Sequence, residues 1–261
     1  MQTNEKIVAL GVGRKGCQVV EQMLGKIEGV EFADVRFQAS DEILDLFKTP
    51  LKFKVNNSDE CKEIIDKNFM DSDVIFVIGD SSLTPNMAKA AKEADKLTIG
   101  IFLSNNEELK AKFKEASDAL ISFDEEKSFD EQIKSSQNVV ESVANLITKS
   151  GFVNLDFEDV KAILQDTGTA FYGAGHAEGD NRAKIAALQA MNMCGEIKQA
   201  KRVLLNITTG GAVSLSEMSD AAEIFEENTA SDAQIIWGHI IDDEMGDNLQ
   251  VVFIAGMNDK K

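Results

Sequence analysis

The sequence has 261 residues, enough for one large domain or two modest ones, each with its own core. Hydrophobic residues make up 43% of the chain, which is typical of a globular protein and argues against disorder. The formal net charge is −18, so we expect neither nucleic acid nor an anionic membrane surface as an unaided partner. No apolar stretch approaches the roughly 18 residues that a membrane span requires.

The amino terminus and the cysteines indicate a cytoplasmic protein. The opening MQTNEKIVALGVG has a strand pattern where a signal peptide has a basic segment and an apolar run. Cys17, Cys61 and Cys194 are far apart and lack metal-ligand spacing, so we expect reduced, structural thiols. His176 and His239 have no neighbouring cysteine or paired histidine, and we predict no metal site.

The first half of the chain alternates apolar runs with amphipathic stretches. The apolar runs predict buried strands at Lys6–Gly11, Val35–Ala39, Val74–Gly79, Leu97–Leu103 and Ala119–Phe123, with a further short strand at Leu51–Val55. Helical spacing is found at Cys17–Leu24, Asp41–Phe47, Ser58–Phe69, Pro85–Ala94 and Glu107–Ala116. This alternation predicts an α/β domain over residues 1–127 with a Rossmann-like parallel sheet covered on both faces.

A long helix is predicted over residues 128–151, where Ser128 and Glu131 have the spacing of a capping box. Its apolar stripe indicates a strut between two halves. Residues 152–261 predict a smaller mixed-sheet α/β domain. Its helices are expected at Phe157–Gln165, Arg182–Met191 and Ser216–Asn228, and its strands at Arg202–Thr208, Ala233–Ile241 and Leu249–Ala255. The polar connection Asp242–Asn248 is short enough to make the last two strands a hairpin.

Segments of the second half, taken in order, resemble the FtsZ family of tubulin-like bacterial cell-division proteins. They are FVNLDFEDV at Phe152–Val160, GAGHAEGDNRA at Gly173–Ala183, VLLNITTG at Val203–Gly210 and NLQVVFIAGM at Asn248–Met257. The resemblance implies a tubulin/FtsZ-like fold, with two domains joined by a central helix, and a cytoskeletal or cell-division-related role in filaments.

The first half resembles that family in outline only. Lys6–Met23 looks like the family's opening strand, glycine loop and helix, but Arg14 and Lys15 replace glycines. Before Pro85, where the family has a run rich in glycine and threonine, this chain has only GDSSLT. Ile133 stands where the central helix should offer an asparagine to the guanine base. The resemblance thus implies a divergent member that lacks the glycine-rich phosphate loop.

Loss of that loop predicts weak or absent GTP binding. A triphosphate is held by a row of backbone N–H groups in unusual conformations that glycine allows. Asp80 would repel phosphates by a few kcal/mol, and Ser81, Ser82 and Thr84 are expected to cap the next helix. We therefore expect no cofactor. If a rebuilt loop does bind GTP with Mg²⁺, the candidate ligands are Gly11, Gly13, Gly16, Arg14, Ser81 and Ser82.

The opening glycines also match the dinucleotide fingerprint GxGxxG between a strand and a helix. That fingerprint needs an acid at the end of the second strand, where this chain has Gln38, Ala39 and Ser40. Asp41 is expected to cap the following helix instead. A dinucleotide-binding Rossmann protein is therefore a disfavoured alternative.

Asn154, Asp156 and Asp159 stand where the family keeps polar groups of an acidic loop. By resemblance, they would reach the nucleotide of the next subunit and orient the attacking water, which makes them the candidate catalytic residues. Asn and Asp also cap helices, so the same residues have an alternative, purely structural interpretation.

Three functions stay open at this stage. The favoured one is an FtsZ-like protein with lost or weakened GTP binding that contacts itself or a complete FtsZ head to tail. The alternatives are a divergent, polymerising GTPase and the dinucleotide binder. Enzyme activity is left open, with a non-enzymatic protein favoured; if the chain is an enzyme, we expect a GTP hydrolase. Because the sequence stops at Met257–Lys261, directly after the last predicted strand, we expect no carboxy-terminal tether peptide.

Overall fold

The computed structural model describes residues 5–37, 48–123, 127–149, 151–194, 197–211 and 213–259. The chain divides into two compact units, and the division falls between Val140 and Glu141, inside one long helix. We call them the N-terminal and C-terminal units and describe each by itself. The predicted helix Asp41–Phe47 and the positions of Gln38, Ala39 and Ser40 lie outside the described residues.

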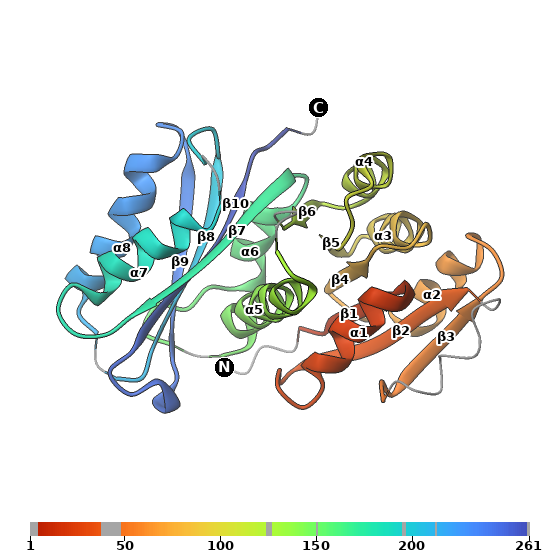
Figure 1. Ribbon diagram of the computed structural model, residues 1–261, viewed down its shortest axis with the longest axis horizontal. Helices are drawn as coiled ribbons and strands as arrows, with labels where there is room; N and C mark the ends of the chain where they lie inside the picture. Colours follow the sequence, from red (N-terminus) through yellow and green to blue (C-terminus); the bar gives the residue numbers. More distant parts are fainter. Residues whose placement is uncertain are drawn as a thin grey trace. The chain divides into compact units, whose positions relative to one another are not determined.

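The N-terminal unit contains a parallel sheet with the strand order β3-β2-β1-β4-β5-β6 (Figure 1). Every residue of β1, β4 and β5 is buried, as expected for the centre of a parallel sheet covered on both faces. The strands are β1 (Ile7–Val12), β2 (Val30–Phe37), β3 (Leu51–Val55), β4 (Val74–Gly79), β5 (Leu97–Phe102) and β6 (Ala119–Ser122).

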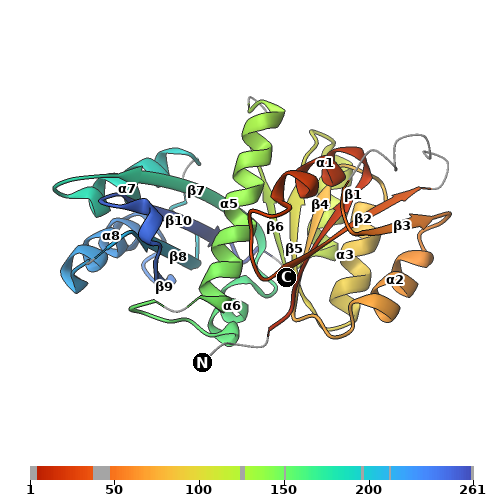
Figure 2. The same cartoon turned by 90° about the horizontal axis from the view of Figure 1, so that it is seen from below.

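Four helices of this unit surround the sheet. The helices α2, α3 and α4 cover one face, where they share a core with β1, β2 and β4, and α1 covers the other face (Figure 2). Their bounds are α1 Gly13–Met23, α2 Glu60–Asn68, α3 Thr84–Glu93 and α4 Glu107–Ala116. The predicted Rossmann-like arrangement is confirmed.

One strand differs from its prediction. β2 begins at Val30, five residues before the predicted start at Val35, and pairs in parallel with β1 from Ile7 onward. The charged residues Glu31 and Asp34 interrupt the apolar pattern of this stretch, and this concealed the beginning of the strand.

The long helix α5 spans Phe129–Thr148, as predicted. Its capping box is present, because the Ser128 N–H donates to Glu131 Oε2 at 2.8 Å and the Glu131 N–H donates to Ser128 Oγ at 3.4 Å. Among the described residues, no helix combines the length and the apolar composition needed to cross a membrane.

The C-terminal unit contains a mixed sheet with the strand order β7-β10-β8-β9. β10 is antiparallel to both β7 and β8, whereas β8 and β9 are parallel. The helices α7 and α8 share an apolar core with one face, and α6 contacts β8 and β9. The elements are α6 Phe157–Leu164, β7 Gly168–Ala177, α7 Arg182–Asn192, β8 Arg202–Thr209, α8 Leu215–Asn228, β9 Gln234–Ile241 and β10 Leu249–Gly256.

The predicted hairpin between the last two strands is wrong. β8 lies between β9 and β10, so these two strands are not hydrogen-bonded to each other. The connection between them contains the 3-10 turn η2 (Asp243–Met245) and contacts the end of β8, where the Asp242 N–H donates to the Thr209 carbonyl oxygen at 2.8 Å. A short connection is compatible with a hairpin, but it cannot decide which strand occupies the central position.

Candidate functional site

Two loops meet at the carboxyl ends of β1 and β4, the edge of a parallel sheet where ligands usually bind. Gly13 begins α1 with a φ of +77°, and a Cβ placed on it would lie 2.7 Å from the Cβ of Ser81. The β4–α3 loop therefore packs directly on the β1–α1 loop. Only glycine fits this position without strain.

The other fingerprint glycines bring α1 close to the sheet. A Cβ on Gly16 would lie 2.1 Å from the carbonyl oxygen of Ile78, and one on Gly11 would lie 2.7 Å from the carbonyl oxygen of Gly16. Both residues are buried. Their structural role is the close packing of a helix against β1 and β4, which accounts for the glycine spacing without a ligand.

The hydroxyl oxygens of Ser81 and Thr84 accept hydrogen bonds from within the β4–α3 loop. The Ser81 N–H donates to Thr84 Oγ1 at 3.1 Å, and the Leu83 N–H donates to Ser81 Oγ at 3.3 Å. Ser82 is exposed, and its carbonyl accepts a bond from Asn86. The prediction of a side-chain cap is wrong, because the N-cap residue of α3 is Leu83, whose side chain cannot accept a hydrogen bond.

Lys15 joins this loop pair to two further segments. Its Nζ lies 3.9 Å from Asp80 Oδ2, donates to the carbonyl oxygen of Leu103 at 3.0 Å, and lies 5.9 Å from the centre of the Phe129 ring. Burial raises the pKa of Asp80, and the nearby Lys15 ammonium opposes that shift. Arg14, in contrast, is exposed. Lys15 is thus a structural cation that already has an anionic partner.

A buried polar cluster beneath α1 was not predicted. Asp34 on β2 is fully buried, and neither of its carboxylate oxygens has a hydrogen-bond partner. Two residues further on, Arg36 donates from Nε to Cys17 Sγ at 3.1 Å, and that thiol donates to the carbonyl oxygen of Gly11 at 3.3 Å. Burial raises the pKa of Asp34 to about 6 and that of Cys17 to about 12. Cys17 is therefore a protonated thiol, and an acid within an apolar stretch was the available signal for the cluster.

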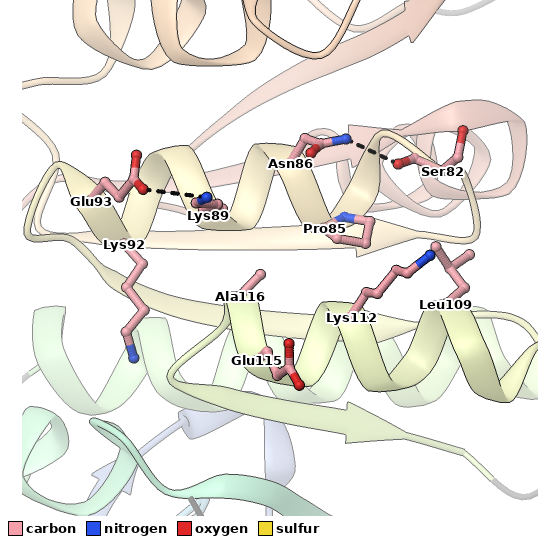
Figure 3. Close-up of a pocket in the computed structure, with 10 residues that line it drawn as sticks. All are labelled: Ser82, Pro85, Asn86, Lys89, Lys92, Glu93, Leu109, Lys112, Glu115 and Ala116. Atoms are coloured by element: carbon pink, nitrogen blue, oxygen red, sulfur yellow. Dashed lines mark hydrogen bonds and ion pairs between the residues drawn. The ribbon is translucent and has the colours of Figure 1, made fainter.

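A hollow of about 680 Å³ lies between α3 and α4 (Figure 3). Of the predicted nucleotide ligands, only Ser82 lines it. Lysines that line the hollow form ion pairs with glutamates: Lys89 lies 3.8 Å from Glu93, and Lys112 lies 2.6 Å from Glu108. With its cations partnered in this way, the hollow offers no concentrated positive charge for a triphosphate.

In the C-terminal unit, the structure brings Asn154, Asp156 and Asp159 together at the start of α6. The Asp159 N–H donates to Asp156 Oδ1 at 2.9 Å, and the Asp156 N–H donates to Asp159 Oδ2 at 3.1 Å, which completes a capping box. Asn154 Oδ1 accepts a bond from the Gly151 N–H at 2.6 Å. Among the described residues, no lysine or arginine pairs with either aspartate, so two carboxylates stand unneutralised at this helix start.

The segment before α6 is hydrogen-bonded to the edge strand β9. The His239 N–H donates to the Val153 carbonyl oxygen at 2.9 Å, and the Phe152 N–H donates to His239 Nδ1 at 3.3 Å. A Cβ on Gly151 would lie 1.5 Å from the carbonyl oxygen of His239, so glycine is required there. Further along the unit, Arg182 forms an ion pair with Glu217 at 2.7 Å and donates to the carbonyl oxygen of Asp247.

In the part of the chain that the structure describes, no three His, Cys, Asp or Glu side chains are grouped as metal ligands. The half-buried Ile133 lies on the second turn of α5, where its side chain offers no hydrogen bond. Of the positions predicted to bind a cofactor, Gly11, Gly13, Gly16 and Ser81 are in close packing, whereas Arg14 and Ser82 are exposed. In the acidic loop, Asn154 and Asp156 are exposed and Asp159 is half-buried.

Comparison with known proteins defines the class. Residues 168–258 match the family model "FtsZ family, C-terminal domain". The fold is similar to an empty FtsZ dimer of M. jannaschii, with a TM-score of 0.83 and 22% identity over 97% of this chain and 88% of that one. It is also similar to GDP-bound CetZ1 from Haloferax volcanii, with a TM-score of 0.70 and 15% identity over 96% and 93%.

A further match is TubZ of Bacillus thuringiensis serovar israelensis in GDP-form protofilaments, with a TM-score of 0.67 and 10% identity over 97% of this chain and 85% of that one. The chain therefore has the FtsZ/tubulin fold. Within that fold, the similarity to the FtsZ family model lies in residues 168–258 of the C-terminal unit.

Proposed function

We propose that this chain is an FtsZ-type cytoskeletal protein with lost or weakened GTP binding, which acts through filament-type protein contacts. The observation that carries the proposal is the direct packing of Ser81 on Gly13. It closes the loop pair in which family members, by the resemblance, hold the nucleotide phosphates.

The residues present do not fit a triphosphate. The loop between Gly79 and Thr84 offers no run of glycine N–H groups, and the hydroxyl oxygens of Ser81 and Thr84 accept hydrogen bonds from within the loop. Asp80 brings a negative charge to the same place, and its partner Lys15 is engaged with it. A bound phosphate would therefore have to break an ion pair and separate two packed turns.

The second half of the proposal concerns the acidic loop. Asp156 is exposed and Asp159 half-buried at the helix start, and neither has a cationic partner among the described residues, as expected for groups that meet a nucleotide and its metal on another molecule. The relatives described as an FtsZ dimer and as TubZ protofilaments support self-association of such chains. We infer that this face docks on the exposed nucleotide of a complete FtsZ and caps or modulates its filaments from one end.

Isothermal titration with GTP and magnesium tests the first half. We expect a dissociation constant weaker than about 10 μM, or roughly −7 kcal/mol. Tighter binding would replace this proposal with the alternative of a divergent GTPase that has a rebuilt phosphate loop. Light scattering of the protein alone should respond little to GTP, because head-to-tail growth would lack its nucleotide contact.

The second half is tested with a complete FtsZ, whose GTPase rate and filament length should change when this protein is added. The matched pair of variants separates charge from capping. D156A/D159A removes both charge and cap, whereas D156S/D159Q keeps a neutral capping box. Under the proposal, both variants lose the effect on FtsZ. If D156S/D159Q acts like the wild type, the aspartates serve only as a cap.

A further inference from the structure

His239 contacts the acidic-loop segment, here residues 151–154, through both its backbone and its ring. The imidazole is 2% exposed. Nδ1 accepts the Phe152 N–H at 3.3 Å, and Nε2 lies 2.9 Å from Thr209 Oγ1. The segment continues into the Asp156–Asp159 capping box, so this contact helps to position the exposed aspartates.

The hydrogen bonds fix the tautomer of the ring. A nitrogen that accepts a backbone N–H carries no proton, so the neutral imidazole has its proton on Nε2. That proton is donated to Thr209 Oγ1, and the Thr209 hydroxyl donates in turn to the carbonyl oxygen of Gly211 at 3.0 Å. All the groups in the chain Phe152–His239–Thr209–Gly211 are therefore hydrogen-bonded at the same time only while the imidazole is neutral.

Protonation changes one contact specifically. A cationic imidazole carries a proton on Nδ1, which then faces the Phe152 N–H, so that two donors oppose each other. The backbone bond from His239 to Val153 and the Nε2–H bond to Thr209 are compatible with both states. The Phe152 bond is thus the part of the attachment that a proton removes, and Phe152 itself is 63% exposed.

The surroundings of the ring favour the neutral state. Burial lowers the pKa of His239, and no charged group is among the causes. Among the described residues, the titratable or charged side chains on elements packed around β9 are Glu141 of α5 and Lys149 just after it, Asp156, Glu158, Asp159 and Lys161 at α6, Arg202 of β8, Glu217, Asp220, Glu223, Glu226 and Glu227 of α8, and Asp242, Asp243 and Glu244 after β9.

We propose that His239 is a proton-sensitive latch that holds the acidic-loop segment at β9 and releases Phe152 on acidification. The latch would regulate the acidic-loop surface that we propose to dock on a complete FtsZ, and in that respect it rests on the proposed function. At neutral pH the latch holds residues 151–154 on β9, and in acidic solution the bond from the Phe152 N–H to His239 is lost.

Nuclear magnetic resonance of the protein alone tests the latch. Imidazole ¹⁵N shifts should report a protonated Nε2 at pH 7.5. On titration to pH 5, the Phe152 amide shift should follow the protonation of His239. H239Q, whose amide can both accept and donate, should abolish that titration. H176Q, which removes the exposed histidine of β7, should leave it unchanged. An Nδ1–H tautomer, or a Phe152 amide indifferent to His239 protonation, would overturn the latch.

A second variant covers the case in which H239Q does not fold. T209V removes the acceptor of the Nε2 proton, so it should shift the tautomer toward Nδ1–H and perturb the Phe152 amide already at pH 7.5. An unperturbed amide in T209V would contradict the latch. Binding to a complete FtsZ should weaken between pH 7.5 and 5.5 in the wild type but not in H239Q, and by less than tenfold, because the pKa of His239 lies below its ordinary value.

These readouts separate the two ideas. No binding at any pH, with a titrating Phe152 amide, refutes the proposed function and leaves the latch. Binding with the same pH dependence in the wild type and H239Q refutes the latch and leaves the proposed function.

Discussion

Lys15 Nζ lies 3.9 Å from Asp80 Oδ2, and this ion pair joins the first turn of α1 to the loop that follows β4. Lys15 also donates to the carbonyl oxygen of Leu103, so one cation connects the ends of β1, β4 and β5. These strand ends are where an open α/β sheet usually binds its ligand. In this protein, the Lys15–Asp80 ion pair lies between the β1–α1 and β4–α3 loops at that position.

Substitution of Asp80 should strengthen residual nucleotide binding. D80N removes a carboxylate from the loop facing the expected phosphate position, and one unit charge at about 8 Å is worth roughly 2 kcal/mol at an effective dielectric near 20. We expect GTP affinity, measured by titration calorimetry, to rise about thirtyfold from its weak baseline. D71N is the control, since Asp71 is an exposed carboxylate paired with Lys6 at the other end of β4. Equal effects of both substitutions would contradict a local role for Asp80.

Gly16 should be required for folding rather than for ligand binding. A Cβ in G16A would lie 2.1 Å from the carbonyl oxygen of Ile78, so α1 would have to move away from β4. We expect the free energy of unfolding in urea to fall by about 3 kcal/mol. G25A is the comparison, because Gly25 has open space and only a positive φ of +72°, which costs about 1 kcal/mol. A G16A protein as stable as G25A would show that the helix moves away easily.

Asp34 should make stability depend on pH. Its pKa in the folded protein is raised to about 6 by burial, so the folded state holds a proton more tightly than the unfolded state does. The resulting stability is present below about pH 4 and is lost as the pH rises through 6. Relative to the wild type, D34N should therefore gain about 3 kcal/mol in unfolding free energy between pH 4 and pH 8.

Urea unfolding at a series of pH values measures that difference, whatever the absolute stability of D34N. His239 acts in the opposite direction, because its lowered pKa removes stability as the pH falls below the unfolded value near 6.5. The double variant D34N/H239Q should therefore have a flatter profile than either single variant. A constant difference between D34N and the wild type would contradict the raised pKa.

The capping box at α6 should be measurable by itself. D156A removes the acceptor for the Asp159 N–H, and we expect it to cost about 1 kcal/mol of stability. D156S retains a capping oxygen and should stay within a few tenths of a kcal/mol of the wild type. Thermal unfolding of both variants checks this, and equal losses would mean that the charge, rather than the cap, stabilises the helix start.

Local patterns were sufficient for much of the fold. The alternation of apolar runs and amphipathic stretches predicted the six strands of the N-terminal sheet, including the short β3. The Ser128–Glu131 pair marked the start of α5, because a capping box joins residues only three positions apart. Asn154, Asp156 and Asp159 were found for the same reason, since they lie within one turn of each other.

Only the tertiary structure decided which distant residues meet. Strand order in a sheet depends on the packing of the whole core, and β8 therefore separates β9 from β10 despite their short connection. The contact of Gly13 with Ser81 and the bond from Phe152 to His239 each join residues that are far apart in the sequence. The burial of Asp34 likewise depends on the packing of distant segments around it. The sequence by itself determined the elements and the glycine positions, whereas long-range packing determined that those glycines serve close contact of the chain with itself.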